Sequence, residues 1–139
     1  MAFENVQSLT DDQIEQLHQL YQNEWWTQGR SLDDVRRIVD FSDFVFGICE
    51  SESKRLVAFA RVLTDRVVKV LIFDVIVEPD YRGRGLGAAL MEQMLGHPEL
   101  SGVKHFELYC LPELAPFYEQ WGFSGELGRL LLMRRELSR

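Results

Sequence analysis

Two arginines and three glycines stand close together in VEPDYRGRGLGAAL, residues 77–90, directly after an apolar run. These residues are Arg82, Gly83, Arg84, Gly85 and Gly87. The glycines permit positive φ angles and close approach of a ligand to the backbone, and the forked guanidinium donors suit phosphate oxygens. The following residues have helical spacing, and a helix start offers free amide donors with a partial positive charge. The pattern favours an anion site for phosphate over the alternative, a simple tight turn.

Other nucleotide and metal motifs do not fit this chain. The three glycines are spaced G-x-G-x-G, whereas the dinucleotide fingerprint requires G-x-G-x-x-G, and the P-loop sequence G-K-[ST] does not occur. Cys49 and Cys110 lie apart within apolar segments, which predicts two free, buried thiols. The three histidines form no metal-ligand pattern, so we expect no metal site.

The elements that must position this turn follow from hydrophobic spacing. Residues 10–26 form a capping box followed by apolar residues at helical spacing, and residues 31–40 predict a second, shorter helix. Two β-rich runs, 43–50 and 55–63, predict a hairpin. Residues 67–77 are apolar at nearly every position, as expected of a central strand. A helix from Leu86 to the GHP at 96–98, a strand at 103–111, a short helix at 113–122 and a closing strand at 128–137 complete the chain.

Composition limits the classes of protein. The length of 139 residues and the absence of a linker predict one α/β (α+β) domain over residues 1–139, with helices packed on a mixed sheet. A formal net charge of −7 argues against a nucleic-acid partner. No apolar run is long enough to cross a membrane, and the N-terminus has no secretion signal, so we expect a cytoplasmic protein without a membrane partner.

Two motifs in order resemble the GNAT N-acetyltransferase superfamily. RGRGLG, residues 82–87, resembles its acetyl-coenzyme A motif R/Q-x-x-G-x-G/A, and APFYEQWGF, residues 115–123, is similar to its C-terminal F/L-Y-x-x-x-G-F segment. The order of elements also matches, so the resemblance covers essentially the whole chain. It implies a mostly antiparallel, twisted sheet with a splayed central strand pair, flanked by about four helices.

The resemblance also implies a binding site for acetyl-CoA as co-substrate. The main chain of Val75, Ile76 and Val77 would bind the pantetheine arm and the acetyl carbonyl, and a backbone N–H there would stabilise the oxyanion. The pyrophosphate would lie on the segment from Arg82 to Ala88. Its members are Arg82, Gly83, Arg84, Gly85, Leu86, Gly87 and Ala88. One departure is Leu111, since many relatives have an asparagine at this position.

Tyr118 and Asp74 are the candidate catalytic residues. Tyr118 matches the tyrosine that protonates the departing thiolate in the family, with core packing as the alternative. Asp74 interrupts the apolar run 67–77, and buried carboxylates usually have a partner or a task. It could handle the proton of the amine, or it could form an ion pair with a residue such as Arg61 on the adjacent strand. Glu78 is a weaker alternative base, and Cys110 is a less favoured acetyl-cysteine candidate.

The resemblance implies acetyl transfer to a primary amine of a small molecule or peptide by direct attack. The acceptor would contact the segment NEWWTQGRSLDD, residues 23–34, where a tryptophan could form a wall and the acidic residues could attract a cation. The alternative is a noncatalytic acyl-CoA-binding module of the same fold. Many relatives dimerise, so a homodimer is an open expectation.

Overall fold

The computed structural model describes residues 2–137 and divides them into two compact units, the first ending at Tyr109 and the second beginning at Cys110. The elements of the first unit are β1 (Phe3–Val6), α1 (Asp11–Gln22), α2 (Leu32–Phe41), β2 (Phe44–Glu50), β3 (Leu56–Thr64), β4 (Lys69–Val77), a 3-10 turn (Pro79–Tyr81), α3 (Leu86–Leu95) and β5 (His105–Leu108). The second unit contains a 3-10 turn (Pro112–Leu114) and α4 (Ala115–Glu119).

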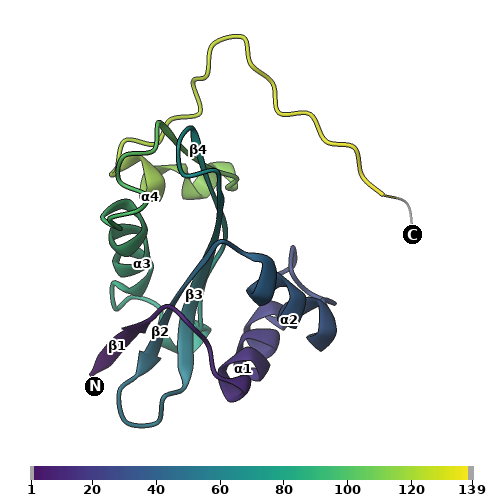
Figure 1. Cartoon of the computed structure of the whole chain (residues 1–139), viewed down its shortest axis with the longest axis vertical. Coiled ribbons are helices and arrows are strands. Elements are labelled where there is room, and N and C mark those ends of the chain that lie inside the picture. The colour runs from purple at the N-terminus through teal and green to yellow at the C-terminus, as the bar shows by residue number, and fades with distance from the viewer. Residues whose placement is uncertain (1, 138–139) are drawn as a thin grey trace. The chain divides into compact units, whose positions relative to one another are not determined.

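The five strands form one sheet in the order β1-β2-β3-β4-β5. Neighbouring strands are antiparallel except β4 and β5, which are parallel. Helices α1 and α2 cover one face of this sheet, and α3 covers the other (Figure 1). The mixed, mostly antiparallel sheet and the four α-helices found within residues 2–137 confirm the predicted fold class.

Helix α1 packs its apolar stripe against the sheet. Thr10 caps the helix, since its side chain accepts a hydrogen bond from the Gln13 amide and the Gln13 side chain accepts one from the Thr10 amide. Leu17 and Tyr21, one turn apart, are fully buried. The Tyr21 ring meets that of Phe59 from β3 edge-on, with 6.3 Å between the centroids. This packing fixes the C-terminal end of α1 over the middle of the sheet.

The predicted extension of the first helix to Trp26 is wrong. The helix ends at Gln22, and Trp25 and Trp26 are 70% and 41% exposed. The chain turns because buried Thr27 donates a hydrogen bond from its hydroxyl to the Tyr21 carbonyl (2.7 Å), and Gly29 adopts a φ of 90°. The resulting loop places the Arg30 guanidinium over the Tyr21 ring, 4.7 Å from its centroid.

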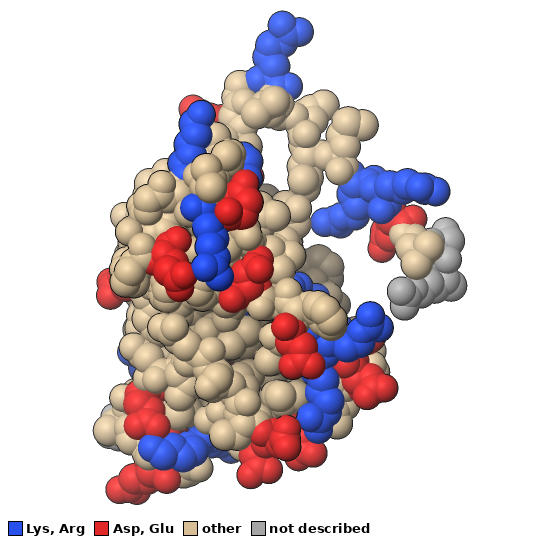
Figure 2. Space-filling view, in the orientation of Figure 1, with Lys and Arg blue, Asp and Glu red and all other residues tan. Residues whose placement is uncertain are grey.

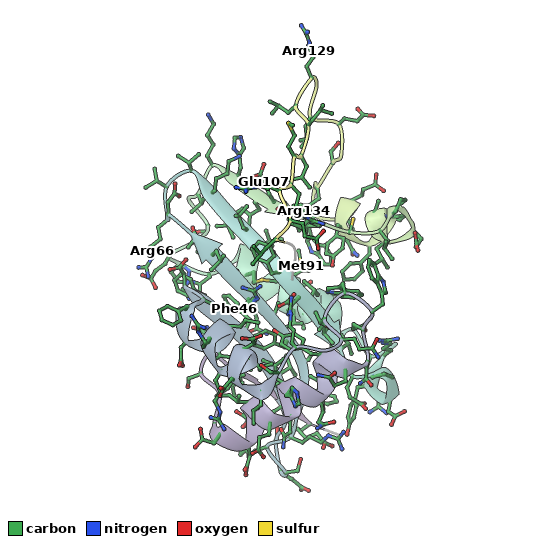
Figure 3. The ribbon with its side chains drawn as sticks, turned by 90° about the vertical axis from the view of Figure 1, so that its right-hand side faces the viewer. Phe46, Arg66, Met91, Glu107, Arg129 and Arg134 are labelled. Carbon is green, nitrogen blue, oxygen red and sulfur yellow. The ribbon has the colours of Figure 1, made fainter. Side chains whose placement is uncertain are left out.

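Helix α3 packs on the opposite face. Its residues Leu90, Met91 and Met94 are fully buried, and Leu90 and Met94 belong to the helical spacing that predicted this helix. Phe46 of β2 is also buried, and both Phe46 and Met91 lie in the interior of the ribbon view in Figure 3. The strand predicted from residue 67 begins at Lys69, because the Asp65 carboxylate accepts hydrogen bonds from the amides of residues 67–69 and holds them in a turn.

The second unit departs from two predictions. Residues 128–137 form no strand, and Leu130, Leu131, Leu132 and Met133 are 68–87% exposed. A β-rich composition becomes a strand only where a partner backbone supplies a hydrogen-bond ladder. Here the Leu130 amide instead donates to the Leu127 carbonyl in a turn. Arg129 extends away from the ribbon here (Figure 3). Cys110 is exposed rather than buried, whereas Cys49 is buried as predicted.

The charged surface is mixed. In Figure 2 the acidic and basic side chains of the face shown are interspersed rather than gathered into one patch of a single sign. Several pair with one another, for example Arg66 with Glu99 at 2.8 Å. Within residues 2–137, no helix has the length and apolarity needed to span a bilayer.

Candidate functional site

A β-bulge in β4 is the first special feature of the site. Phe59 and Arg61 of β3 pair with Ile76 and Phe73 of β4, so two residues of β4, Asp74 and Val75, lie opposite one residue of β3. Asp74 has a φ of +58°, in the left-handed region that few residues other than glycine adopt. The bulge turns the Asp74 side chain inward: the side chain is 4% exposed although the residue as a whole is half-buried. The exposed part of Asp74 is therefore mainly backbone.

The Asp74 carboxylate is the centre of a buried cluster. Its Oδ2 accepts hydrogen bonds from Arg30 Nη1 (2.8 Å), Arg61 Nε (2.8 Å) and the Tyr21 hydroxyl (3.0 Å). Of the two alternatives open from the sequence, the ion pair with Arg61 is therefore present. A direct role of Asp74 towards an amine stays a prediction.

The cluster fixes the protonation of its members. Burial alone would raise the pKa of Asp74, but the hydrogen bonds and charges of Arg30 and Arg61 outweigh it and hold this pKa below the ordinary value. Burial raises the pKa of Tyr21 above its ordinary value, and the neighbouring Asp74 charge adds to the effect. At neutral pH the cluster therefore contains a carboxylate, two guanidinium ions and a neutral phenol.

Sequence reasoning missed Tyr21 and Arg30 as members of this cluster. Tyr21 is one of the apolar residues at helical spacing in 10–26, a pattern that indicates a core position, and the residue is fully buried. Arg30 follows Gly29 in the loop after α1, and no spacing rule connects it to a strand 44 residues later. A buried carboxylate in an apolar strand was the signal that partners had to exist, without saying which.

Beyond Ile72, one edge of β4 has no strand partner among the described residues. The parallel pairing of β4 with β5 ends at Ile72 and Leu108, so residues 73–77 have no partner on that side among the strand pairs of the described chain. Val75, Ile76 and Val77 lie on this edge. Ile76 is buried against the core under α1, while Val75 and Val77 are half-buried. The predicted splay of the central strand pair stays a prediction, because β5 itself ends at Leu108. Without a strand partner on this side, the edge of β4 offers main-chain groups to an extended ligand.

The glycine turn leads from β4 into α3. Gly83 and Gly85 have φ angles of +78° and +77°, and a Cβ atom at either position would meet no atom within 4 Å. Gly85 is the N-cap of α3, and no side chain of the described residues caps this helix. The first amides of α3, at Leu86, Gly87 and Ala88, therefore keep the donor character of a helix start. This geometry fits the predicted pyrophosphate site.

The two arginines of the turn have protein partners. Arg82 donates from Nη2 to Glu24 Oε1 (2.8 Å) and from Nε to the Val77 carbonyl (3.3 Å). The Arg84 guanidinium lies over the Tyr81 ring, 5.1 Å from its centroid. The Arg82 side chain is 55% exposed, so it can reach a ligand as well. Glu24 belongs to the loop after α1, and its contact ties this loop to the glycine turn.

Tyr118 lies in α4 of the second unit. It is buried, and its ring contacts those of Phe117 and Phe123 at 5.0 and 6.2 Å. Burial, with a smaller effect of Cys110, raises the pKa of Tyr118 to about 12. The phenol is therefore protonated at neutral pH and can donate a hydrogen bond. Within the described residues, no three His, Cys, Asp or Glu side chains are grouped so that they could hold a metal ion.

Comparisons with known proteins agree on one family. The profile described as "Acetyltransferase (GNAT) domain" matches residues 42–125. The chain is 34% identical over 127 residues to an uncharacterized N-acetyltransferase ycf52-like protein of Prochlorococcus marinus, covering 90% of this chain and 68% of that protein. It is 36% identical over 97 residues to Serotonin N-acetyltransferase 2, chloroplastic, of Oryza sativa subsp. japonica. That match covers 68% of this chain and 48% of the rice protein, so the chain spans about half of the rice protein's length.

A similar solved structure belongs to the same family. A protein from Xanthomonas campestris pv. campestris, assigned to the GNAT acetyltransferase family, superimposes with a TM-score of 0.81 and 31% sequence identity. The match covers 99% of this chain and 94% of that protein.

Proposed function

Because the chain belongs to the GNAT acetyltransferase family, we propose that it transfers an acetyl group from acetyl-CoA to a primary amine by direct attack. The observation that carries the proposal is the continuity of residues 74–88. This segment presents first an unpaired strand edge with a bulge and then a helix start without a side-chain cap. A strand edge can pair with an extended thioester arm, and the helix start that follows it can bind the pyrophosphate at the end of that arm.

The main chain does most of the binding in this proposal. Val75, Ile76 and Val77 would bind the pantetheine arm along the open edge of β4, and an amide of this edge would stabilise the oxyanion that forms when the thioester is attacked. The segment from Arg82 to Ala88 would bind the pyrophosphate with its amides and with Arg82. Arg82 already pairs with Glu24, so its guanidinium would then donate hydrogen bonds both to Glu24 and to the phosphate.

The amine must lose a proton before it attacks. A lysine-like ammonium with a pKa near 10.4 is about 4.6 kcal/mol from its neutral form at pH 7. Asp74 is a weak base for this step, because its pKa is lowered and three donors already occupy its Oδ2. We propose that Asp74 mainly holds Arg30 and Arg61 in place, and that the ammonium releases its proton to water before it attacks.

Tyr118→Phe is expected to lower kcat by about tenfold, because one hydrogen bond to the developing thiolate is lost. Full proton transfer is not required, since a phenol with a pKa of about 12 is a weaker acid than a thiol with a pKa near 8.5. The measurement is thiol release from acetyl-CoA at saturating amine. Glu119→Gln, at an exposed position of the same helix, is the control, and an unchanged kcat in Tyr118→Phe contradicts the assignment.

The acceptor is proposed at the level of a small-molecule or peptide amine. The name of the rice relative places arylalkylamines in the first panel, together with amino acids, polyamines and peptide N-termini. A cytoplasmic location and a homodimer stay predictions.

The first test is calorimetric titration of acetyl-CoA, followed by thiol release with the amine panel. We expect binding, and turnover on at least one amine. Arg82→Ala should weaken acetyl-CoA binding by about tenfold, because a charged hydrogen bond is lost. Arg66→Ala, in an exposed ion pair with Glu99, should leave binding unchanged. No binding by the intact chain contradicts the proposal, and binding without turnover on any amine favours the noncatalytic alternative.

A further inference from the structure

The cluster around Asp74 carries a surplus of positive charge. Arg30 and Arg61 contribute two positive charges and Asp74 one negative charge, while the Tyr21 phenol is neutral. One arginine would suffice to neutralise the carboxylate. Charges removed from water are unfavourable unless they are paired, so the second arginine creates a place where an anion is stabilised. This place stands out in a protein whose formal net charge is −7.

Both guanidinium groups have donors to spare. Arg30 uses Nη1 and Arg61 uses Nε towards Asp74, and neither group has a second hydrogen-bond acceptor among the described residues. Each guanidinium has five N–H donors. The side chains are 25% and 15% exposed, so they are accessible from solvent, although mostly enclosed. Since both donors lie 2.8 Å from the same carboxylate oxygen, the two guanidinium groups are neighbours and could hold one oxyanion together.

Aromatic rings hold the two groups in place. The Arg30 guanidinium lies over the Tyr21 ring at 4.7 Å, and that of Arg61 over the Phe73 ring at 4.9 Å. Stacking on one face leaves the edges of a guanidinium free to donate hydrogen bonds. The Phe73 ring also contacts that of Tyr109 edge-on at 5.9 Å, which adds apolar surface beside the charge.

The cluster lies next to the main chain that would hold the thioester. Phe73 and Asp74 directly precede Val75 in β4, and Arg30 comes from the loop after α1, in the segment expected to contact the acceptor. All of these residues belong to the first unit. An anion bound here would be close to the bulge and on the acceptor's side of the proposed site.

From these observations we infer that Arg30 and Arg61 bind an oxyanion of the acceptor, a carboxylate or a phosphate, so that the substrate is an amine that also carries an acidic group. The inference rests on the proposed function, because it names the substrate class of the same site. In the competing explanation, the ion pair between Arg30 and Asp74 only holds the loop after α1 against the sheet. Its remaining donors would then be hydrated, and no acidic ligand would be preferred.

The test compares amines that differ by one acidic group. L-Tyrosine and tyramine, and O-phosphoethanolamine and ethanolamine, are titrated by calorimetry into the full chain with and without saturating CoA. Thiol release from acetyl-CoA is then measured with the same four amines. We expect the acidic member of at least one pair to bind about tenfold more tightly than its partner, because it gains charged hydrogen bonds.

Arg30→Gln should abolish this preference, since it removes the charge and the forked donor group while it keeps a polar side chain. Arg66→Gln, which alters an exposed arginine in an ion pair of the same 2.8 Å length, should retain it. Arg30 is the better target because Arg61 is more enclosed and its loss could unfold the chain. A thermal unfolding curve of each variant checks that it is folded.

The outcomes separate the inference from the proposed function. A preference in the tyrosine pair alone identifies a carboxylate, and one in the phosphoethanolamine pair alone identifies a phosphate. Equal or weaker binding of both acidic members, or a preference that survives in Arg30→Gln, overturns the inference even if tyramine is acetylated. An anion preference that depends on Arg30, without turnover of any amine in the wider panel, supports the anion site and contradicts the proposed acetyl transfer.

Discussion

Gly85→Val is expected to weaken acetyl-CoA binding by about a hundredfold, because at least two charged hydrogen bonds to phosphate are misaligned. Gly85 is the N-cap of α3 with a φ of +77°, and a β-branched residue rarely adopts this conformation. The backbone must rotate to relieve the strain, and this rotation changes the direction of the amides that follow. Calorimetric titration of acetyl-CoA measures the effect.

The same variant separates binding from folding. A Cβ atom at Gly85 meets no protein atom within 4 Å, so the main cost to stability is about 1–2 kcal/mol from the left-handed backbone. Gly102→Val is the matched control. A Cβ atom there also meets nothing within 4 Å, and its φ lies outside the positive range. Binding that survives in Gly85→Val, or is lost equally in Gly102→Val, contradicts a phosphate site at this turn.

Local patterns in the sequence predicted most of the first unit. The capping box at Thr10, the β-rich runs of the hairpin β2–β3 and the helical spacing after Gly85 each involve residues near one another in the chain. The glycine turn was predictable for the same reason, since its chemistry is contained in six consecutive residues. Features of this kind depend on backbone propensities that act over a few positions.

Features that depend on distant partners were not predictable. Tyr21 meets Asp74 because α1 packs on the sheet, and Arg30 meets it because the loop after α1 folds back over the sheet. Glu24 meets Arg82 across 58 positions. The apolar residues 130–133 have the composition of a strand, but they lie exposed without a ladder. Propensity alone could not show that this segment lacks a partner within the described residues.

Asp74→Asn is expected to lower the free energy of unfolding by about 3–5 kcal/mol at neutral pH, since it leaves two enclosed guanidinium ions without their counter-ion. Asparagine is the informative substitution, because it tolerates the positive φ of 58°. The loss then reports the charge rather than backbone strain. Urea unfolding measures this loss of free energy. The control is Glu99→Gln, which breaks the exposed ion pair with Arg66, also 2.8 Å long, and should lower the free energy of unfolding by less than about 1 kcal/mol. A similarly small loss in Asp74→Asn would mean that water stabilises the charges of both arginines when the carboxylate is absent.

The difference in free energy of unfolding between the native chain and Asp74→Asn should depend on pH, which gives an independent check. The pKa of Asp74 is lower in the folded chain than its ordinary value of 3.8, so its contribution to stability is fully present well above that value. The contribution is lost as the pH falls through the ordinary value and towards the lower folded pKa, where the carboxylate of the folded protein takes up a proton. The free energies of unfolding of the native chain and of Asp74→Asn should therefore converge below about pH 4. A gap that stays constant through this range would show that the loss arises from packing or hydrogen-bond geometry rather than from the charge that holds Arg30 and Arg61 together.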